Sequence, residues 1–172
     1  VFSTDHKVIG LQYLFTGLAF LLFGGILALL IRWQLAHTWQ KVPYLGWEIL
    51  PDAYTSLFTM HGTIMVFWAM TPILIGGFGN YVVPLQIGAR DMCFPRLNML
   101  YYWIFFVACL LLVLSYFVPG GPATAGWTAY PPLSGSEEWT PGWGQSLWIL
   151  AVAFVGVSSL MGGINFITTT LQ

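Results

Sequence analysis

The sequence carries little charge. Asp, Glu, Lys and Arg make up 6% of its 172 residues, and the formal net charge is −1. So few cations offer no basic surface for a nucleic acid, and the acids are too few for a solvated acidic tail. Cysteine is also scarce: Cys93 and Cys109 stand sixteen positions apart with no CxxC motif, so neither a zinc site nor a disulfide framework is indicated. The composition therefore excludes a nucleic-acid-binding protein and a disulfide-rich scaffold.

Long uncharged runs occupy most of the chain, and hydrophobic residues reach 58%. Charge is absent from residues 8–31, 53–89, 97–136 and 139–172. A helix needs about 20 apolar residues to cross the hydrocarbon core, so these runs predict an all-α membrane protein with four transmembrane helices. We place the spans at about 8–36, 54–84, 97–119 and 145–171. The runs are apolar all round rather than amphipathic, which favours lipid over a soluble core.

Six tryptophans mark the predicted span ends, as interfacial aromatic belts do. They are Trp33, Trp39, Trp47, Trp139, Trp143 and Trp148. The loop 119–144 is rich in Pro, Gly and Trp, which disfavours a helix and favours tight turns at the membrane surface. We interpret this loop as a lid over one membrane face.

Basic residues favour the cytoplasmic side of a membrane. With four crossings, the N-terminus and loop 85–96 share a face that carries three Lys/Arg, against two on the other face. This difference places the N-terminus in the cytoplasm. The last residues still belong to a helical run with no basic stop after it, so we expect the chain to be a piece of a longer polypeptide.

His61 is the most informative residue, because it is an ionisable group inside the charge-free run 53–89. Such groups are rare within membranes and are usually functional. Imidazole is a good ligand for haem iron, so we interpret His61 as a cofactor ligand; a structural histidine bonded to a neighbouring helix is the alternative. It lies about 10 Å along the helix from Tyr54 at the outer end, so the site is nearer the outer face.

Arg32 lies near the outer end of the first predicted span. Its guanidinium could pair with a carboxylate or carbonyl of a bound cofactor, or it could extend to the outer headgroups. His6 and His37 are terminal or interfacial, so this chain supplies no second histidine within a span for the same haem.

Polar residues gather toward the inner face and could hold a chain of water molecules. They are Tyr13, Asn80, Asp91, Asn98, Ser158 and Ser159. Asp91 would accept protons at the mouth of such a chain. The alternative for Asp91 is a loop residue paired with Arg90 or Arg96.

Several strings of the sequence together resemble subunit I of the haem–copper respiratory oxidases. The strings are STDHKVIG, LLIRWQL, FTMHGTIMVFW, PILIGGFGNYVVPLQIGARDMCFPRLN, GWTAYPPLSG and GVSSLMGGINFITT. The resemblance spans nearly all of residues 1–172 and corresponds to the first four of that subunit's usual twelve helices, an incomplete domain.

The resemblance implies roles for four residues near the outer face. His61 would be an axial ligand of the low-spin haem iron, and Arg32 would contact the formyl group of that haem, which would make it haem A. Trp127 and Tyr130 match an outer-loop motif near the haems, where we expect a structural or propionate-side role.

The resemblance also decides between the two interpretations of Asp91, which matches the entrance of the family's D-type proton pathway. Asn80, Asn98, Tyr13, Ser158 and Ser159 would be members of that path. The second axial histidine, the high-spin haem ligand and the copper ligands would lie beyond residue 172, so this segment alone would not reduce oxygen and contains no catalytic residue.

These implications give a first hypothesis: part of the catalytic subunit of a terminal oxidase that reduces dioxygen and pumps protons with partner subunits. Quinol-oxidising members carry an Arg and an acid where this chain has Phe23 and Leu27, so we expect cytochrome c or a similar protein donor. The alternatives are a quinol-oxidising member of the same family and a non-catalytic haem-binding membrane module.

Overall fold

Four long helices form the protein, as seen in a computed structural model that describes residues 2–171. They are α1 (His6–Ala36), a second span that runs Pro51–Ile87, α4 (Pro95–Leu114) and α5 (Gly144–Leu171). All four are long and apolar enough to cross a membrane, which confirms the predicted all-α membrane architecture.

The second span is not one regular α-helix. It consists of α2 (Pro51–Thr63), two π-helical segments, η1 (Ile64–Met70) and η2 (Pro72–Gly79), and α3 (Asn80–Ile87). Pro72 lacks a backbone N–H, and the Thr71 hydroxyl donates to the carbonyl of Val66, five residues back, at 2.8 Å. The π-helix is rare, and its short turns inside α-helices are frequently found at functional sites.

The predicted boundaries agree within three residues except at the end of the third span. We expected that span to continue to residue 119, but α4 ends at Leu114. The chain then turns through Tyr116 and Phe117, whose amides donate three residues back, and Pro119 and two glycines follow. Because these residues disfavour a helix, the helix ends before the apolar run does.

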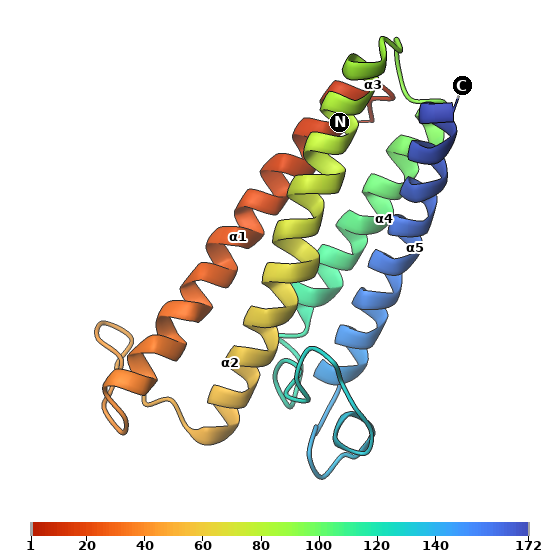
Figure 1. Ribbon diagram of the computed structural model, residues 1–172. Coiled ribbons are helices and arrows are strands. Elements are labelled where there is room, and N and C mark those ends of the chain that lie inside the picture. Colours follow the sequence, from red (N-terminus) through yellow and green to blue (C-terminus); the bar gives the residue numbers. More distant parts are fainter. Residues whose placement is uncertain (1, 172) are drawn as a thin grey trace.

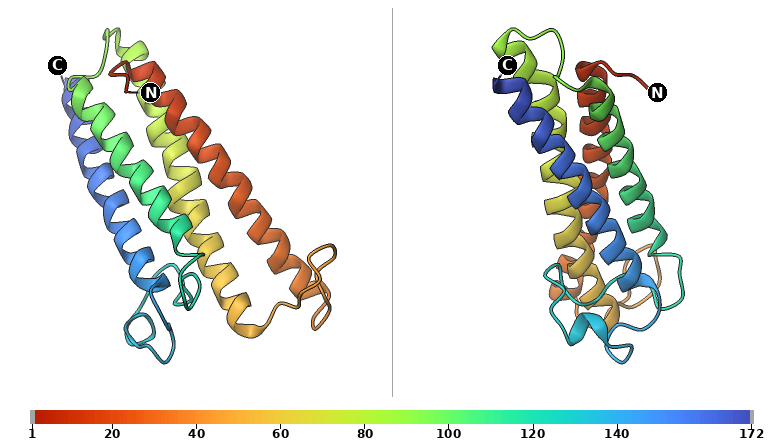
Figure 2. Two further views of the ribbon diagram at one scale, coloured as in Figure 1. Left: turned by 180° about the vertical axis from the view of Figure 1, so that it is seen from behind. Right: turned by 90° about the vertical axis from the view of Figure 1, so that its right-hand side faces the viewer.

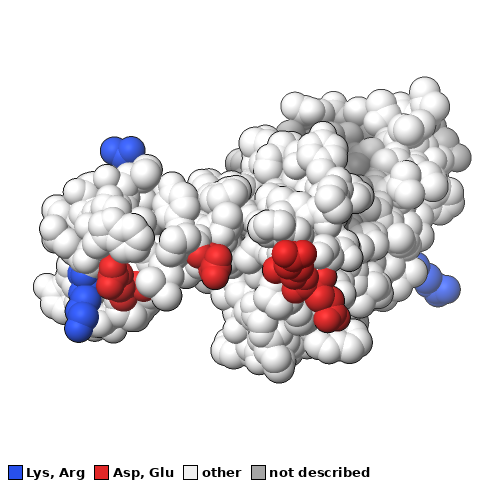
Figure 3. Space-filling view, turned by 90° about the horizontal axis from the view of Figure 1, so that it is seen from below, with Lys and Arg blue, Asp and Glu red and all other residues white. Residues whose placement is uncertain are grey.

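The helices form two antiparallel hairpins, one of α1 with the second span and one of α4 with α5 (Figures 1 and 2). The N-terminal end of α1, the turn after α3 and the C-terminal end of α5 lie together at one end of the bundle. The two long loops lie at the other end. Figure 3 looks onto this loop end, where a few charged side chains stand out from an otherwise uncharged surface.

A stripe of glycines joins α1 to the second span. Gly10, Gly17 and Gly24 are spaced seven residues apart on the buried face of α1. A methyl group built on Gly17 would lie 2.6 Å from Ile73 Cγ1, and one on Gly10 would lie 3.0 Å from the carbonyl oxygen of Gly77. Small residues let membrane helices approach closely, and this approach fixes the depth of α1 against the second span.

Trp148 departs from its predicted place in an interfacial belt. It is buried, and its indole N–H donates to the Thr63 hydroxyl at 3.0 Å. The hydrogen bond satisfies a polar group that would otherwise be buried alone, and it ties α5 to α2.

The η3 segment (Leu133–Gly135) is the only 3₁₀ turn in residues 2–171 and lies in the loop after α4.

Candidate functional site

His61 lies in α2, and its imidazole is held by the backbone of the neighbouring helix. Its Nδ1 is 2.9 Å from the carbonyl oxygen of Gly24. A carbonyl oxygen can only accept, so Nδ1 is the donor, and in the neutral ring this tautomer leaves the lone pair on Nε2. Metal-ligating histidines commonly donate their second ring nitrogen to a carbonyl in this way. The half-buried imidazole of His61 is therefore held in one orientation, as a haem-iron ligand requires.

Gly24 makes this hydrogen bond possible because it brings α1 close to α2. A methyl group built on Gly24 would lie 2.8 Å from Met65 Sδ and 3.1 Å from Ile64 Cγ2. Any side chain at position 24 would push the two helices apart and withdraw the carbonyl from His61.

The loop after α4 packs onto the second span beside His61. The amide of Gly126 donates to the Thr59 hydroxyl at 3.0 Å. The indole of Trp127 lies against Gly62, and its ring centroid is 6.1 Å from that of Phe67. Trp127 therefore lies near the predicted ligand even though it is about half exposed in this chain.

Arg32 and Tyr130 are not brought to His61 by residues 2–171. Arg32 is exposed and follows Gly24 by eight residues, about 12 Å along α1 toward the loops. Tyr130 is 71% exposed. Their predicted contacts with a haem stay predictions.

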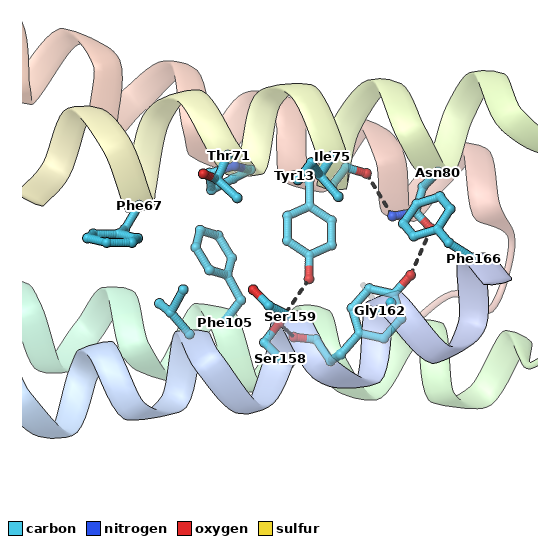
Figure 4. A pocket seen from close by; sticks show the side chains of 15 residues that line it. Tyr13, Phe67, Thr71, Ile75, Asn80, Phe105, Ser158, Ser159, Gly162 and Phe166 are labelled. Atoms are coloured by element: carbon cyan, nitrogen blue, oxygen red, sulfur yellow. Dashed lines mark hydrogen bonds between the residues drawn. The ribbon is translucent and has the colours of Figure 1, made fainter.

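A cavity of about 210 Å³ lies between the two hairpins, extending from Phe67 toward the end of the bundle where α1 begins (Figure 4). Four of the six predicted pathway residues line it: Tyr13, Asn80, Ser158 and Ser159. Figure 4 shows Tyr13 reaching across from α1 toward α5, with Asn80 farther from Phe67 than Tyr13 is. Residues far apart in the sequence thus bring a few polar groups into one largely apolar cavity.

Hydrogen bonds link the polar side chains around this cavity. Asn80 donates through Nδ2 to the carbonyl of Gly76 at 2.7 Å and accepts at Oδ1 from the Tyr101 hydroxyl at 2.9 Å. The Ser158 hydroxyl donates to the carbonyl of Tyr101 at 2.7 Å and lies 3.4 Å from the hydroxyl of Tyr13. The chain of contacts joins α1, the second span, α4 and α5.

Glycine shapes the cavity wall at position 76. A methyl group built on Gly76 would lie 2.5 Å from two ring carbons of Tyr13. The Tyr13 ring can therefore cross toward Ser158 only because this position has no side chain.

Asn98 is fully buried in α4, and neither its Oδ1 nor its Nδ2 has a partner within residues 2–171. Buried amides normally bind protein groups or ordered water, so Asn98 fits a water-binding role. It does not line the cavity described above.

Asp91 lies in the turn between α3 and α4, at the end of the bundle where α1 begins (Figure 1), and is half-buried. Its carboxylate accepts from the amide of Met92 at 2.7 Å, a local turn contact rather than a bond to Arg90 or Arg96. The proton-acceptor role of Asp91 stays a prediction.

Three buried polar residues were missed by the sequence analysis. Asn165 accepts at Oδ1 from the amide of Phe94 at 2.9 Å and so ties α5 to the turn that carries Asp91. Tyr101 bridges Asn80 and Ser158. His6, interpreted as terminal, is 2% exposed. An asparagine inside the fourth apolar run was a usable signal, whereas a tyrosine or an N-terminal histidine reveals its contacts only in the fold.

These features define a class: an integral membrane protein with a histidine inside one span, bonded to the backbone of a neighbouring helix, and a separate cavity into which a few polar side chains reach. Within that class, the chain belongs to the family of subunit I of the haem–copper oxidases. The family model described as "Cytochrome C and Quinol oxidase polypeptide I" matches residues 8–172.

Named relatives agree with this membership. The chain is 50% identical over 168 residues to cytochrome c oxidase subunit 1 of Thermostichus vulcanus, covering 98% of this chain and 28% of that protein. It is 45% identical to the alternative cytochrome c oxidase subunit 1 of Bradyrhizobium diazoefficiens, over 100% of this chain and 28% of the relative. It is 47% identical to the heme-copper oxidase subunit I+III of Aeropyrum pernix, over 97% of this chain and 20% of the relative. The chain therefore spans between a fifth and a third of the length of these relatives.

Proposed function

We propose that residues 1–172 are the N-terminal part of the catalytic subunit of a terminal respiratory oxidase. The full subunit would reduce dioxygen to water with electrons from cytochrome c and couple this reaction to proton pumping. The observation that carries the proposal is the imidazole of His61, whose Nδ1–H is held by the Gly24 carbonyl and whose Nε2 is left for iron.

On the outer side, His61 would ligate the iron of a low-spin haem, which supplies one-electron transfer when bound. The Gly24 carbonyl would keep the ring in one orientation and raise its basicity. Arg32 would contact the formyl group of haem A, and Trp127 and Tyr130 would lie on the propionate side. The high-spin haem and copper would be held by parts of the subunit beyond residue 172.

On the inner side, Asp91 would take up protons. The protons would then move into the membrane along water molecules held by Asn98, Asn80, Tyr13, Ser158 and Ser159. The cavity of about 210 Å³ supports this role because polar side chains reach into its largely apolar walls and it has room for several waters, each of which takes about 30 Å³ in the liquid.

Cytochrome c or a similar protein is the preferred electron donor. The positions where quinol-oxidising members would carry an Arg and an acid are occupied by apolar packing: the Phe23 ring lies 5.4 Å from that of Tyr116, and Leu27 is 4% exposed. The test is the activity of the full complex with reduced cytochrome c against a ubiquinol analogue. Faster turnover with the quinol would reverse the preference.

The subunit would work in a multi-subunit complex in a bacterial cytoplasmic membrane, with its N-terminus in the cytoplasm. The alternative is a haem-binding membrane module without catalysis. Copper distinguishes the two, since the oxidase requires copper in the purified complex and the module does not.

The test of the ligand is His61→Ala in the full-length complex. We expect the low-spin haem absorbance to be lost, while His37→Ala, a matched change at an exposed histidine, leaves it intact. Survival of the band at full intensity in the His61 variant would refute the assignment.

A further inference from the structure

His6 is the first residue of α1, yet it is 2% exposed and contacts the far end of the second span. Its Nδ1 is 2.8 Å from the backbone carbonyl oxygen of Asn80. As at His61, a carbonyl can only accept, so Nδ1 donates. The contact spans 74 residues of sequence, so the two helix ends meet only in the fold.

The Asn80 carbonyl has a reason to need an external donor. In an α-helix this oxygen would accept from the amide four residues later, which here belongs to Pro84. Proline has no N–H, and its ring crowds the carbonyl four residues before it. Both Asn80 and Pro84 are fully buried, so water does not readily replace the missing donor.

Local features aim His6 at this carbonyl. Asp5 caps α1 by accepting from the amides of Lys7 and Val8 at 2.7 and 3.3 Å. One turn further along α1, Gly10 approaches the Gly77 carbonyl closely. The N-terminal turn of α1 is therefore fixed at both ends, and His6 has a defined position.

We propose that His6 is a positioning residue for Asn80: its Nδ1–H replaces the donor that Pro84 cannot supply and so holds the Asn80 side chain in the cavity. The side chain of Asn80 then keeps both of its bonds, to Gly76 and to Tyr101. The inference rests on the proposed role of Asn80 in proton uptake. It predicts that His6 acts on proton transfer without touching water in the cavity or the haem.

The experiment uses the full-length oxidase complex and a second-site rescue. His6→Leu removes the donor, and His6→Asn keeps an N–H at the position of Nδ1. Pro84→Ala restores a backbone N–H at the residue four positions after Asn80. We expect proton uptake to slow several-fold in His6→Leu, to stay near the parent rate in His6→Asn, and to recover in the double variant His6→Leu/Pro84→Ala.

Two further measurements distinguish the role of His6 from the role of Asn80 in proton uptake. With asparagine labelled with ¹³C at its backbone carbonyl, a band of the labelled carbonyl should shift to higher frequency in His6→Leu. The band should return to its original frequency in the double variant. Asn80→Leu tests the pathway itself. An intact low-spin haem spectrum in every variant excludes a simple folding defect, and His37→Leu is the control histidine.

The outcomes are distinct. If Asn80→Leu slows proton uptake but His6→Leu does not, or if the double variant stays as slow as His6→Leu, the positioning role of His6 is refuted. If Asn80→Leu leaves proton uptake unchanged, the pathway proposal fails instead, and the carbonyl band alone then reports whether the His6 hydrogen bond exists.

Discussion

Replacing Gly24 by alanine should disturb the imidazole of His61 without altering it chemically. The added methyl group would lie 2.8 Å from Met65 Sδ and 3.1 Å from Ile64 Cγ2. Methionine is flexible and can yield, but the branched Ile64 is fully buried and cannot easily move. The helices must therefore separate, and the 2.9 Å bond from His61 to the Gly24 carbonyl should lengthen or break.

Two opposing terms set the magnitude. Alanine is better than glycine in a helix by about 1 kcal/mol, whereas overpacking a filled interface costs about 1–3 kcal/mol. The net loss of stability should therefore be about 0–2 kcal/mol. The effect on ligation should be larger, because loss of a partner that orients a metal ligand commonly costs about 10- to 100-fold in affinity.

The assay is the reduced-minus-oxidised spectrum and the midpoint potential of the low-spin haem in the full complex. Gly25→Ala is the matched control, since a methyl group there meets no atom within 4 Å in this chain and gains the same helix propensity. We expect a changed low-spin band and potential for Gly24→Ala only. An unchanged spectrum in the Gly24 variant would show that the Gly24 carbonyl does not orient the ligand.

Three other changes test separate parts of the structure. Asp91→Asn removes the proposed proton acceptor at the inner mouth, so proton uptake should slow or uncouple from oxygen reduction; a normal pumping ratio, measured by acidification outside oxidase vesicles, would contradict the pathway. Gly76→Ala should displace the Tyr13 ring, which would lie 2.5 Å from the new methyl group, and slow proton uptake while leaving the low-spin haem spectrum unchanged. Thr59→Val removes the hydroxyl that accepts from the Gly126 amide, and leaving this amide unpaired costs about 1–3 kcal/mol. Hydrogen exchange in residues 119–144 should therefore accelerate. Unaltered exchange would show that this hydrogen bond does not hold Trp127 in place.

Hydropathy was sufficient to predict the number and type of elements, because a membrane span needs only length and the absence of charge. Positions 8–36 and 145–171 were close to α1 and α5 for this reason. The same signal failed after Leu114, since residues 115–118 are apolar enough for lipid but are followed by Pro119 and Gly120. Hydropathy indicates whether a residue is tolerated in lipid, and it does not indicate the backbone conformation of that residue.

Partners across the bundle could not be predicted from sequence. Nothing in the residues near His61 indicates that the Gly24 carbonyl accepts a hydrogen bond from its imidazole. This contact depends on the position of α1 along the axis of the second span. Trp148 shows the same limit: its position near a span end favours the interface, but a hydrogen bond to Thr63 buries it. His6 was interpreted as terminal or interfacial because of its place in the sequence, but its side chain is buried in the fold.

The π-helical stretch from Ile64 to Gly79 has a consequence for changes in chain length. A π-helical turn holds one residue more than the α-helical hydrogen-bonding pattern requires, so deletion of one residue there could convert a turn to α and leave the flanking helices in register. The same deletion between Tyr54 and His61 would rotate the imidazole by about 100° away from Gly24. A one-residue deletion among relatives should therefore be tolerated better within the π-helical stretch than between Tyr54 and His61.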